Sequence, residues 1–127
     1  MKYRVLLSVV IGVVFTISGC KDNSPTQQVV KKPKVKPIPY VQAWTYGQSK
    51  LVAIDKEHSE NSKGILALSQ KLCEAENICI AMFWDDIKLT PRGTPMTDKQ
   101  VEAKVAHYNY NKNTGLNRLR MCRKVGC

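Results

Sequence analysis

Between residues 41 and 84, hydrophobic side chains recur mainly with the spacing of short strands. Residues 41–46 and 51–54 are rich in β-favouring side chains and flank a turn at Gly47, which predicts a β-hairpin. Residues 78–84 are apolar on both faces, a pattern typical of a central strand buried on both sides. Between these segments, Ser62 is suited to cap a helix that ends near Glu74, with an apolar face of Ile65, Leu66, Leu68 and Leu72.

The clearest helix-start signal in the chain follows the loop after residue 84. Thr97 and Gln100 have the three-residue spacing of a capping box, and Asp98 complements the positive end of the helix. The helix is predicted to fade near residue 109, with an apolar face formed by Val101, Val105 and Tyr108.

Residues 116–122 alternate between apolar and basic side chains after a turn at residues 113–115, which predicts a last strand. Leu119 and Met121 should point inward, and Arg118 and Arg120 outward. The predicted order is β-β-α-β-α-β, an α+β fold with both helices on one face of a small sheet. Residues 41–127 provide enough chain for one small globular domain and too little for two.

The first residues have the composition of an export signal. Lys2 and Arg4 give a positive start, residues 5–17 are largely apolar, and Ser18 and Gly19 are small. The apolar run of 13 residues is shorter than the about 20 residues that a helix needs to span a bilayer. The sequence therefore predicts a signal peptide over residues 1–19.

The segment Ile17-Ser18-Gly19-Cys20 resembles the lipobox of bacterial lipoproteins, and the resemblance covers residues 1–20 only. It implies cleavage before Cys20, lipidation of Cys20 with diacylglycerol and a further fatty acid such as palmitate, and attachment to a membrane. In enteric lipoproteins, Asp directly after the Cys retains the protein in the inner membrane. Lys21 at this position therefore implies the outer membrane, with the domain facing the periplasm, and the inner membrane is the alternative location. The alternatives to a lipoprotein signal are an ordinary secretory signal and an uncleaved membrane anchor.

Residues 20–40 contain Cys20 and a polar segment that becomes rich in lysine and proline. Proline fixes φ and like charges repel each other, so we expect a disordered, extended tether between the lipid and the domain. Contact of its lysines with anionic envelope polymers or lipid head groups is an alternative role.

Four cysteines remain once Cys20 is assigned to lipid: Cys73, Cys79, Cys122 and Cys127. An even number in an exported protein predicts two disulfides, which suit a small domain with a thin core. Short separations favour Cys73–Cys79 and Cys122–Cys127, while crossed pairing between the two clusters stays open. The spacings are wider than usual for zinc, and export favours oxidation, so we expect no metal and no other cofactor.

The mature chain is strongly basic. Removal of residues 1–19 leaves 18 basic and 10 acidic side chains, a net charge of +8. No acidic residue follows Glu102. The residues after it include a cluster of basic side chains that we take as the candidate partner surface: Arg118, Arg120, Arg123 and Lys124. Outside the cytoplasm, such a cluster favours an acidic protein surface or an anionic envelope polymer over nucleic acid. Outward arginines also suit an edge strand protected from aggregation, and the sequence does not separate these two roles.

Candidate catalytic residues are few. Asp85 and Asp86 follow the central strand, but adjacent side chains of an extended chain point to opposite sides. His58 and His107 have no partner at the spacing of a metal site or a catalytic triad. We therefore expect no enzyme activity and assign no catalytic residue.

The hypothesis that agrees best with these features is a membrane-anchored binding or structural accessory of the cell envelope. It would dock onto another envelope protein, for example in a secretion, conjugation or exclusion apparatus. The alternatives are an inhibitor of a cell-wall hydrolase and, third, a small hydrolase that uses Asp85 or Asp86. The resemblance to a known protein class ends at residue 20.

Overall fold

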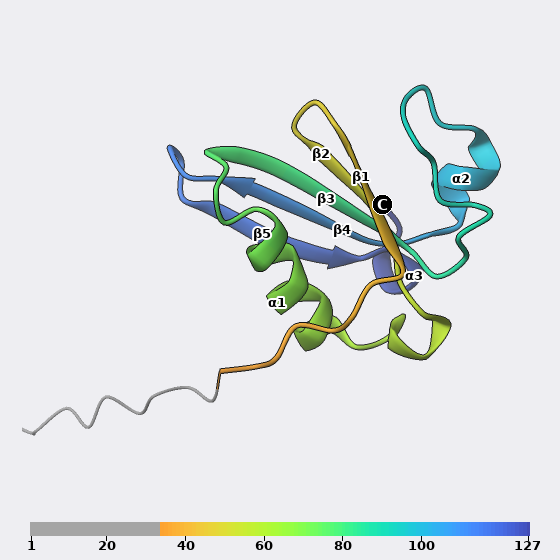
Figure 1. Ribbon diagram of the computed structural model, residues 1–127, viewed down its shortest axis with the longest axis horizontal. Coiled ribbons are helices and arrows are strands. Elements are labelled where there is room, and N and C mark those ends of the chain that lie inside the picture. Colours follow the sequence, from red (N-terminus) through yellow and green to blue (C-terminus); the bar gives the residue numbers. More distant parts are fainter. Residues whose placement is uncertain (1–33) are drawn as a thin grey trace, which may run out of the picture. The chain divides into compact units, whose positions relative to one another are not determined.

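Five strands form one mixed sheet in the part of the chain that the computed structural model describes, residues 34–127 (Figure 1). The strands are β1 (Gln42–Tyr46), β2 (Ser49–Ala53), β3 (Ile78–Trp84), β4 (Lys104–Asn111) and β5 (Leu116–Met121). Their order across the sheet follows the chain, and only the neighbours β2 and β3 run parallel. The predicted signal peptide, Cys20 and the tether up to residue 33 lie outside the described residues.

The parallel pair β2–β3 is connected by a short 3-10 helix η1 (Lys56–His58) and by helix α1 (Ser62–Leu72). The residue that caps α1 is Asn61, whose side-chain oxygen accepts a hydrogen bond from the amide of Gly64 at 2.9 Å, rather than the predicted Ser62. Apolar residues of α1 and of the sheet form one buried cluster, so α1 covers one face of the sheet. Within residues 34–127, no helix combines the length and the apolar character needed to cross a membrane.

Ile38 lies in the segment predicted as a tether, and it packs into the core of the domain. Its side chain is among the buried residues that contact α1, and its amide donates a hydrogen bond to the carbonyl of Gly64 at 3.4 Å. A Cβ atom at position 64 would collide with the Ile38 side chain, so glycine permits this close approach. The chain is therefore packed against the domain before β1 begins.

The capping box at Thr97 is confirmed, but the helix that it starts is much shorter than predicted. Helix α2 (Asp98–Glu102) is followed at once by β4, whereas the prediction continued the helix to about residue 109. Val101 is 44% exposed, while Val105 and Tyr108 are buried in the sheet. The reason is tertiary: β4 pairs with β3 on one side and β5 on the other, and this outweighs the helical spacing. The α+β class is confirmed, with an additional strand in the predicted order.

A second, smaller apolar cluster lies on the sheet face opposite α1. Leu51, Met82 and Trp84 form it, and Trp44 packs against them. The indole N–H of Trp84 donates a hydrogen bond to the carbonyl of Gln100 at 2.6 Å, which holds α2 on this side. The expectation that both helices lie on one face is therefore wrong.

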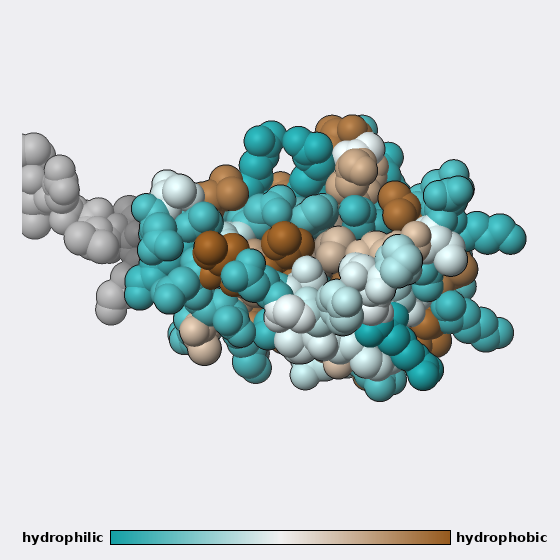
Figure 2. Space-filling view, turned by 90° about the horizontal axis from the view of Figure 1, so that it is seen from above, coloured by the Kyte–Doolittle hydropathy of each residue, from teal (hydrophilic) through white to brown (hydrophobic). Residues whose placement is uncertain are grey.

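On the surface seen in Figure 2, hydrophobic side chains occur in small groups between hydrophilic ones.

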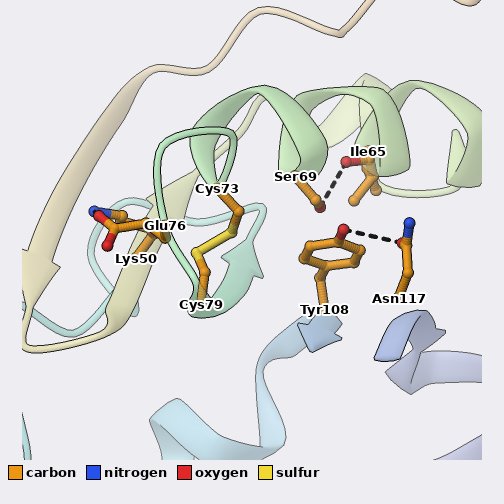
Figure 3. The surroundings of a disulfide bond; sticks show 8 residues. All are labelled: Lys50, Ile65, Ser69, Cys73, Glu76, Cys79, Tyr108 and Asn117. Carbon is orange, nitrogen blue, oxygen red and sulfur yellow. Dashed lines mark hydrogen bonds and ion pairs between the residues drawn. A yellow bond between two sulfur atoms is a disulfide. The ribbon is translucent and has the colours of Figure 1, made fainter. Parts of the chain in front are cut away.

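The disulfide Cys73–Cys79 joins the end of α1 to β3, as the short sequence separation favoured (Figure 3). Both cysteines are buried, and their Cα atoms are 5.6 Å apart. Beside them, Lys50 of β2 forms an ion pair with Glu76, with Nζ and Oε1 at 3.1 Å. The disulfide and the ion pair both hold the connection between α1 and β3 against the sheet.

The disulfide Cys122–Cys127 encloses the last helix, α3 (Cys122–Val125). The pairing favoured by the sequence is confirmed here too, and crossed pairing between the two cysteine clusters is excluded. This disulfide keeps the end of the chain near β4 and β5, which α3 contacts.

Candidate functional site

Basic and polar side chains of β4 and β5 share the sheet face that lies opposite α1. Residues that pair across neighbouring strands lie on the same face, and His107 pairs with Met82 on one side and Arg120 on the other. In the next row, Asn109 pairs with Arg118. We call this part of the sheet the basic face.

The loop between β3 and α2 covers the neighbouring part of the same sheet face, over β1–β3. The guanidinium carbon of Arg92 lies 5.6 Å from the centre of the Trp44 ring, and Met96 packs against the cluster around Trp84. This side of the sheet therefore has an apolar, covered half over β1–β3 and a basic half over β4 and β5, where Arg118 and Arg120 are exposed.

A β-bulge places Lys104 on the basic face. Side chains three positions apart on a regular strand point to opposite faces, so strict alternation would separate Lys104 from His107. The register shifts at the end of β3: Ala106 pairs with Phe83, but the next residue of β3 pairs with Lys104 and not with Val105. Val105 and Ala106 thus both enter the core, and Lys104 and His107 are directed to the same side.

Lys104 and His107 occupy an unusual electrostatic environment. Lys104 is only 7% exposed, and burial lowers the pKa of its ammonium group. Burial also lowers the pKa of His107; the charges of Lys104 and Arg120 lower it further, while a side-chain hydrogen bond with Asn109 raises it in part. The Nε2 atom of His107 is buried and has no hydrogen-bond partner among the described residues.

The structure divides the candidate partner surface into two parts. Arg123 forms an ion pair with Asp85, with Nη2 and Oδ2 at 2.7 Å. Lys124 Nζ lies 3.7 Å from a carboxylate oxygen of Glu60. Arg118 and Arg120, together with Lys104, have no ion pair within 4.0 Å in the part of the chain that the structure describes. These three cations therefore lie together on the basic face without a counter-charge within 4.0 Å among the described residues.

Asp85 and Asp86, the candidate hydrolase pair, have separate structural contacts. The side chain of Asp85 is 8% exposed and faces Arg123. Asp86 shapes the following turn: its Oδ1 accepts a hydrogen bond from the amide of Lys88 at 2.8 Å, and its carbonyl accepts one from Thr90 Oγ1 at 2.9 Å. Each aspartate thus has a structural role that is independent of the other.

Replacement of Asp85 by Asn should lower the free energy of unfolding by about 1 kcal/mol, because it removes a charged acceptor from Arg123. Urea unfolding followed by circular dichroism measures this change. Asp86→Asn keeps a side-chain oxygen for the Lys88 amide and serves as the matched control, with little expected effect. Equal destabilisation by both substitutions would contradict the role assigned to the Asp85–Arg123 pair.

Lys104, His107 and Asn109 were not recognised as site residues from the sequence. The predicted helix placed His107 beside an apolar face, without a partner, whereas β4 places it next to Lys104 and Arg120. One available signal was the alternation of polar residues 107, 109 and 111 with apolar or aromatic residues 106, 108 and 110. The bulge that brings in Lys104 has no comparable signal.

No family model, no curated protein and no solved structure matches this chain. Within residues 34–127, no three side chains of His, Cys, Asp or Glu are grouped so that they could hold a metal ion.

Proposed function

We propose that this protein is a lipid-anchored accessory of the bacterial cell envelope whose domain binds an acidic envelope component through the basic face. The observation that carries the proposal is the gathering of Lys104, Arg118 and Arg120 on one sheet face without ion pairs among the described residues. Clustered cations of one sign attract an acidic partner and speed its association. The lipobox-like segment supports the envelope location, and the net charge of +8 of the mature chain supports an acidic partner.

The two arginines are suited to recognition rather than only to protection of an edge. Protection of β5 from edge pairing requires only charge, whereas the basic face also includes a buried lysine and a buried imidazole nitrogen. Burial lowers the pKa of Lys104, which has no ion pair among the described residues, and ionisable groups with shifted pKa values are concentrated at functional sites. The arrangement therefore favours a bound partner that supplies negative charge.

The anchor is tested by labelling cells with radioactive palmitate. The protein should carry the label and sediment with the outer membrane, and Cys20→Ala should lose both properties, because the sulfur of Cys20 is the predicted lipid attachment atom. Unchanged labelling of Cys20→Ala, or labelled protein found in the inner membrane, would contradict this part of the proposal.

The binding surface is tested by photo-crosslinking in intact envelopes from a reactive side chain at position 116, which is 44% exposed at the rim of the basic face. Arg118→Glu combined with Arg120→Glu should reduce the crosslinked product by more than about tenfold, because like charges then oppose the acidic partner. The matched control is Lys63→Glu combined with Lys71→Glu, which makes the same charge change at exposed positions of α1. Equal loss in both double variants would show that only net charge matters and would overturn the assignment to this face.

A further inference from the structure

The basic face contains a pocket of about 400 Å³. Its lining consists of Lys104, His107, Asn109, Leu116, Arg118, Arg120 and Cys127. Cys127 belongs to the lining, and its disulfide with Cys122 fixes the chain end at this position. The strands β4 and β5 thus supply the cationic and polar groups of the pocket, and Cys127, which the disulfide joins to the end of β5, forms another side of it.

We propose that this pocket binds the oxyanion of a phosphate group, with Lys104, His107, Arg118 and Arg120 as the binding residues. The proposal rests on the proposed function, because the pocket lies on the same basic face, and it names the chemistry that the face recognises. Phosphate has three or four acceptor oxygens directed tetrahedrally, so it can accept hydrogen bonds from several side chains that approach from different sides.

The donor set favours phosphate over a carboxylate. Each guanidinium group offers a planar fork of N–H donors, and the ammonium of Lys104 offers three more. A carboxylate has only two oxygens and is satisfied by one arginine fork, which would leave the remaining cations of the pocket uncompensated. The pocket is also larger than a phosphate ion alone, so it can accommodate the first atoms of an ester substituent.

Two side chains of the pocket, Lys104 and His107, lack the partners that such groups usually have, and this is a second observation that points to a ligand. Lys104 is more than nine-tenths buried and has no ion pair within 4.0 Å among the described residues. The buried Nε2 of His107 also has no partner there. Buried polar groups are almost always hydrogen-bonded, so the buried Nε2 of His107 is an exception that a ligand would explain. An oxyanion in the pocket would accept a hydrogen bond from this nitrogen and would also supply a counter-charge for Lys104.

The bulge in β4 indicates that the pocket depends on a specific backbone feature. Without the extra residue at Val105, the side chains of Lys104 and His107 would lie on opposite faces of the sheet. Bulges commonly redirect a side chain next to a functional site. Here the bulge adds a buried cation to a face that already carries Arg118 and Arg120.

Binding should be coupled to protonation of His107. The groups that face it are Lys104 on its own strand and Arg120 on β5, both cationic, with Asn109 as a hydrogen-bond partner and the apolar Met82 on β3. Burial and the two cations hold the pKa of His107 below its usual value, so the free imidazole is largely neutral at pH 7. A bound anion favours the protonated form, so the affinity should rise as the pH falls below 7.

The test is calorimetric titration of the full protein, purified in an uncharged maltoside detergent and a phosphate-free buffer. The probes are inorganic phosphate and glycerophosphoglycerol, a soluble phosphodiester with the head-group chemistry of an anionic phospholipid. Both should bind to one site. Tighter binding of inorganic phosphate identifies free phosphate or a monoester as the source of the group, and tighter binding of the diester identifies a lipid head group. Absence of binding by both probes would overturn the pocket assignment.

Variants locate the binding within the protein. Arg118→Gln combined with Arg120→Gln should weaken binding by at least about tenfold, and so should Lys104→Met, which keeps the buried apolar stem and removes the charge. The matched control is Arg123→Gln combined with Lys124→Gln, which removes the same charge outside the pocket and should leave the affinity within about twofold. Equal weakening by the control pair would show non-specific attraction and overturn the proposal.

The NMR signal of the His107 imidazole gives a readout that a purely structural role would not move. Saturation with glycerophosphoglycerol, whose own charge is constant between about pH 5 and 8, should raise the pKa of His107, and His107→Gln should abolish the pH dependence of binding. An unchanged pKa in the saturated protein would contradict the pocket. The crosslinking experiment at position 116 tests the proposed function independently of phosphate binding. If the Arg118→Glu/Arg120→Glu variant loses the crosslinked partner but neither phosphate probe binds the protein, the proposed function is retained and only the phosphate pocket is rejected.

Discussion

Replacement of Trp84 by Ala should lower the free energy of unfolding by about 3–5 kcal/mol, the largest effect expected for a single substitution in this domain. Trp84 is completely buried at the end of β3, where it packs with Leu51 and Met82. Its indole N–H also holds α2 through the carbonyl of Gln100. The substitution therefore removes a large apolar side chain, leaves a cavity and releases the helix that precedes β4.

The measurement is urea unfolding followed by far-ultraviolet circular dichroism, which does not depend on indole fluorescence. Trp84→Phe should cost less, because it retains much of the apolar contact and loses mainly the hydrogen bond, worth about 1 kcal/mol. Trp44→Ala is the matched control on the same face, since Trp44 is only half-buried and is covered by Arg92. If Trp44→Ala and Trp84→Ala were equally destabilising, the second apolar cluster would not be centred on Trp84.

Removal of the Cys73–Cys79 disulfide by a double Ala substitution should lower the free energy of unfolding by about 2–4 kcal/mol. The disulfide restricts the unfolded chain, and in the folded domain it joins the end of α1 to the central strand. Both cysteines are almost completely buried, so the double substitution also leaves unfilled space in the core. Chemical unfolding of the purified protein under oxidising conditions measures the loss.

The second disulfide provides the matched comparison. Cys122 and Cys127 are separated by 5 positions and Cys73 and Cys79 by 6, so the restriction of the unfolded chain is nearly equal for the two bonds. Cys122 and Cys127 are not buried, and their double Ala variant should therefore be the less destabilised of the two. The opposite order would show that burial of Cys73 and Cys79 contributes little beyond the covalent link.

Local signals were sufficient for a large part of the fold. The hairpin around Gly47, helix α1 and the buried strand β3 were all predicted from residue spacing, and each is present. The disulfide pairs were favoured by short separations, which lower the cost of closing a loop, and both are confirmed. These features depend on residues close together in the sequence, so the information needed to predict them is contained in short segments.

The prediction for residues 97–109 was wrong because two local patterns overlapped. Thr97 and Gln100 do start a helix, but Val105 and Tyr108 fit both a helical face and a strand with one bulge. The choice between them depends on the hydrogen-bonding edges that β3 and β5 present to β4. The residues of β3 that pair with β4 lie 20 to 33 positions upstream of their partners, so a short segment around residues 97–109 does not contain this information.

The sequence by itself determined the α+β class and the basic character of the last strand, with Arg118 and Arg120 on its outward side. It favoured the two observed disulfide pairs but left crossed pairing open, and the structure decided between them. The lipobox-like segment ending at Cys20 likewise comes from the sequence alone and stays a prediction. Only the tertiary structure decided which of these side chains lie together: Arg123 and Lys124 form ion pairs with Asp85 and Glu60, while Lys104 and His107 line one pocket with the two arginines. The physical reason is that strand register and one bulge, rather than proximity along the chain, determine which charged side chains share a face.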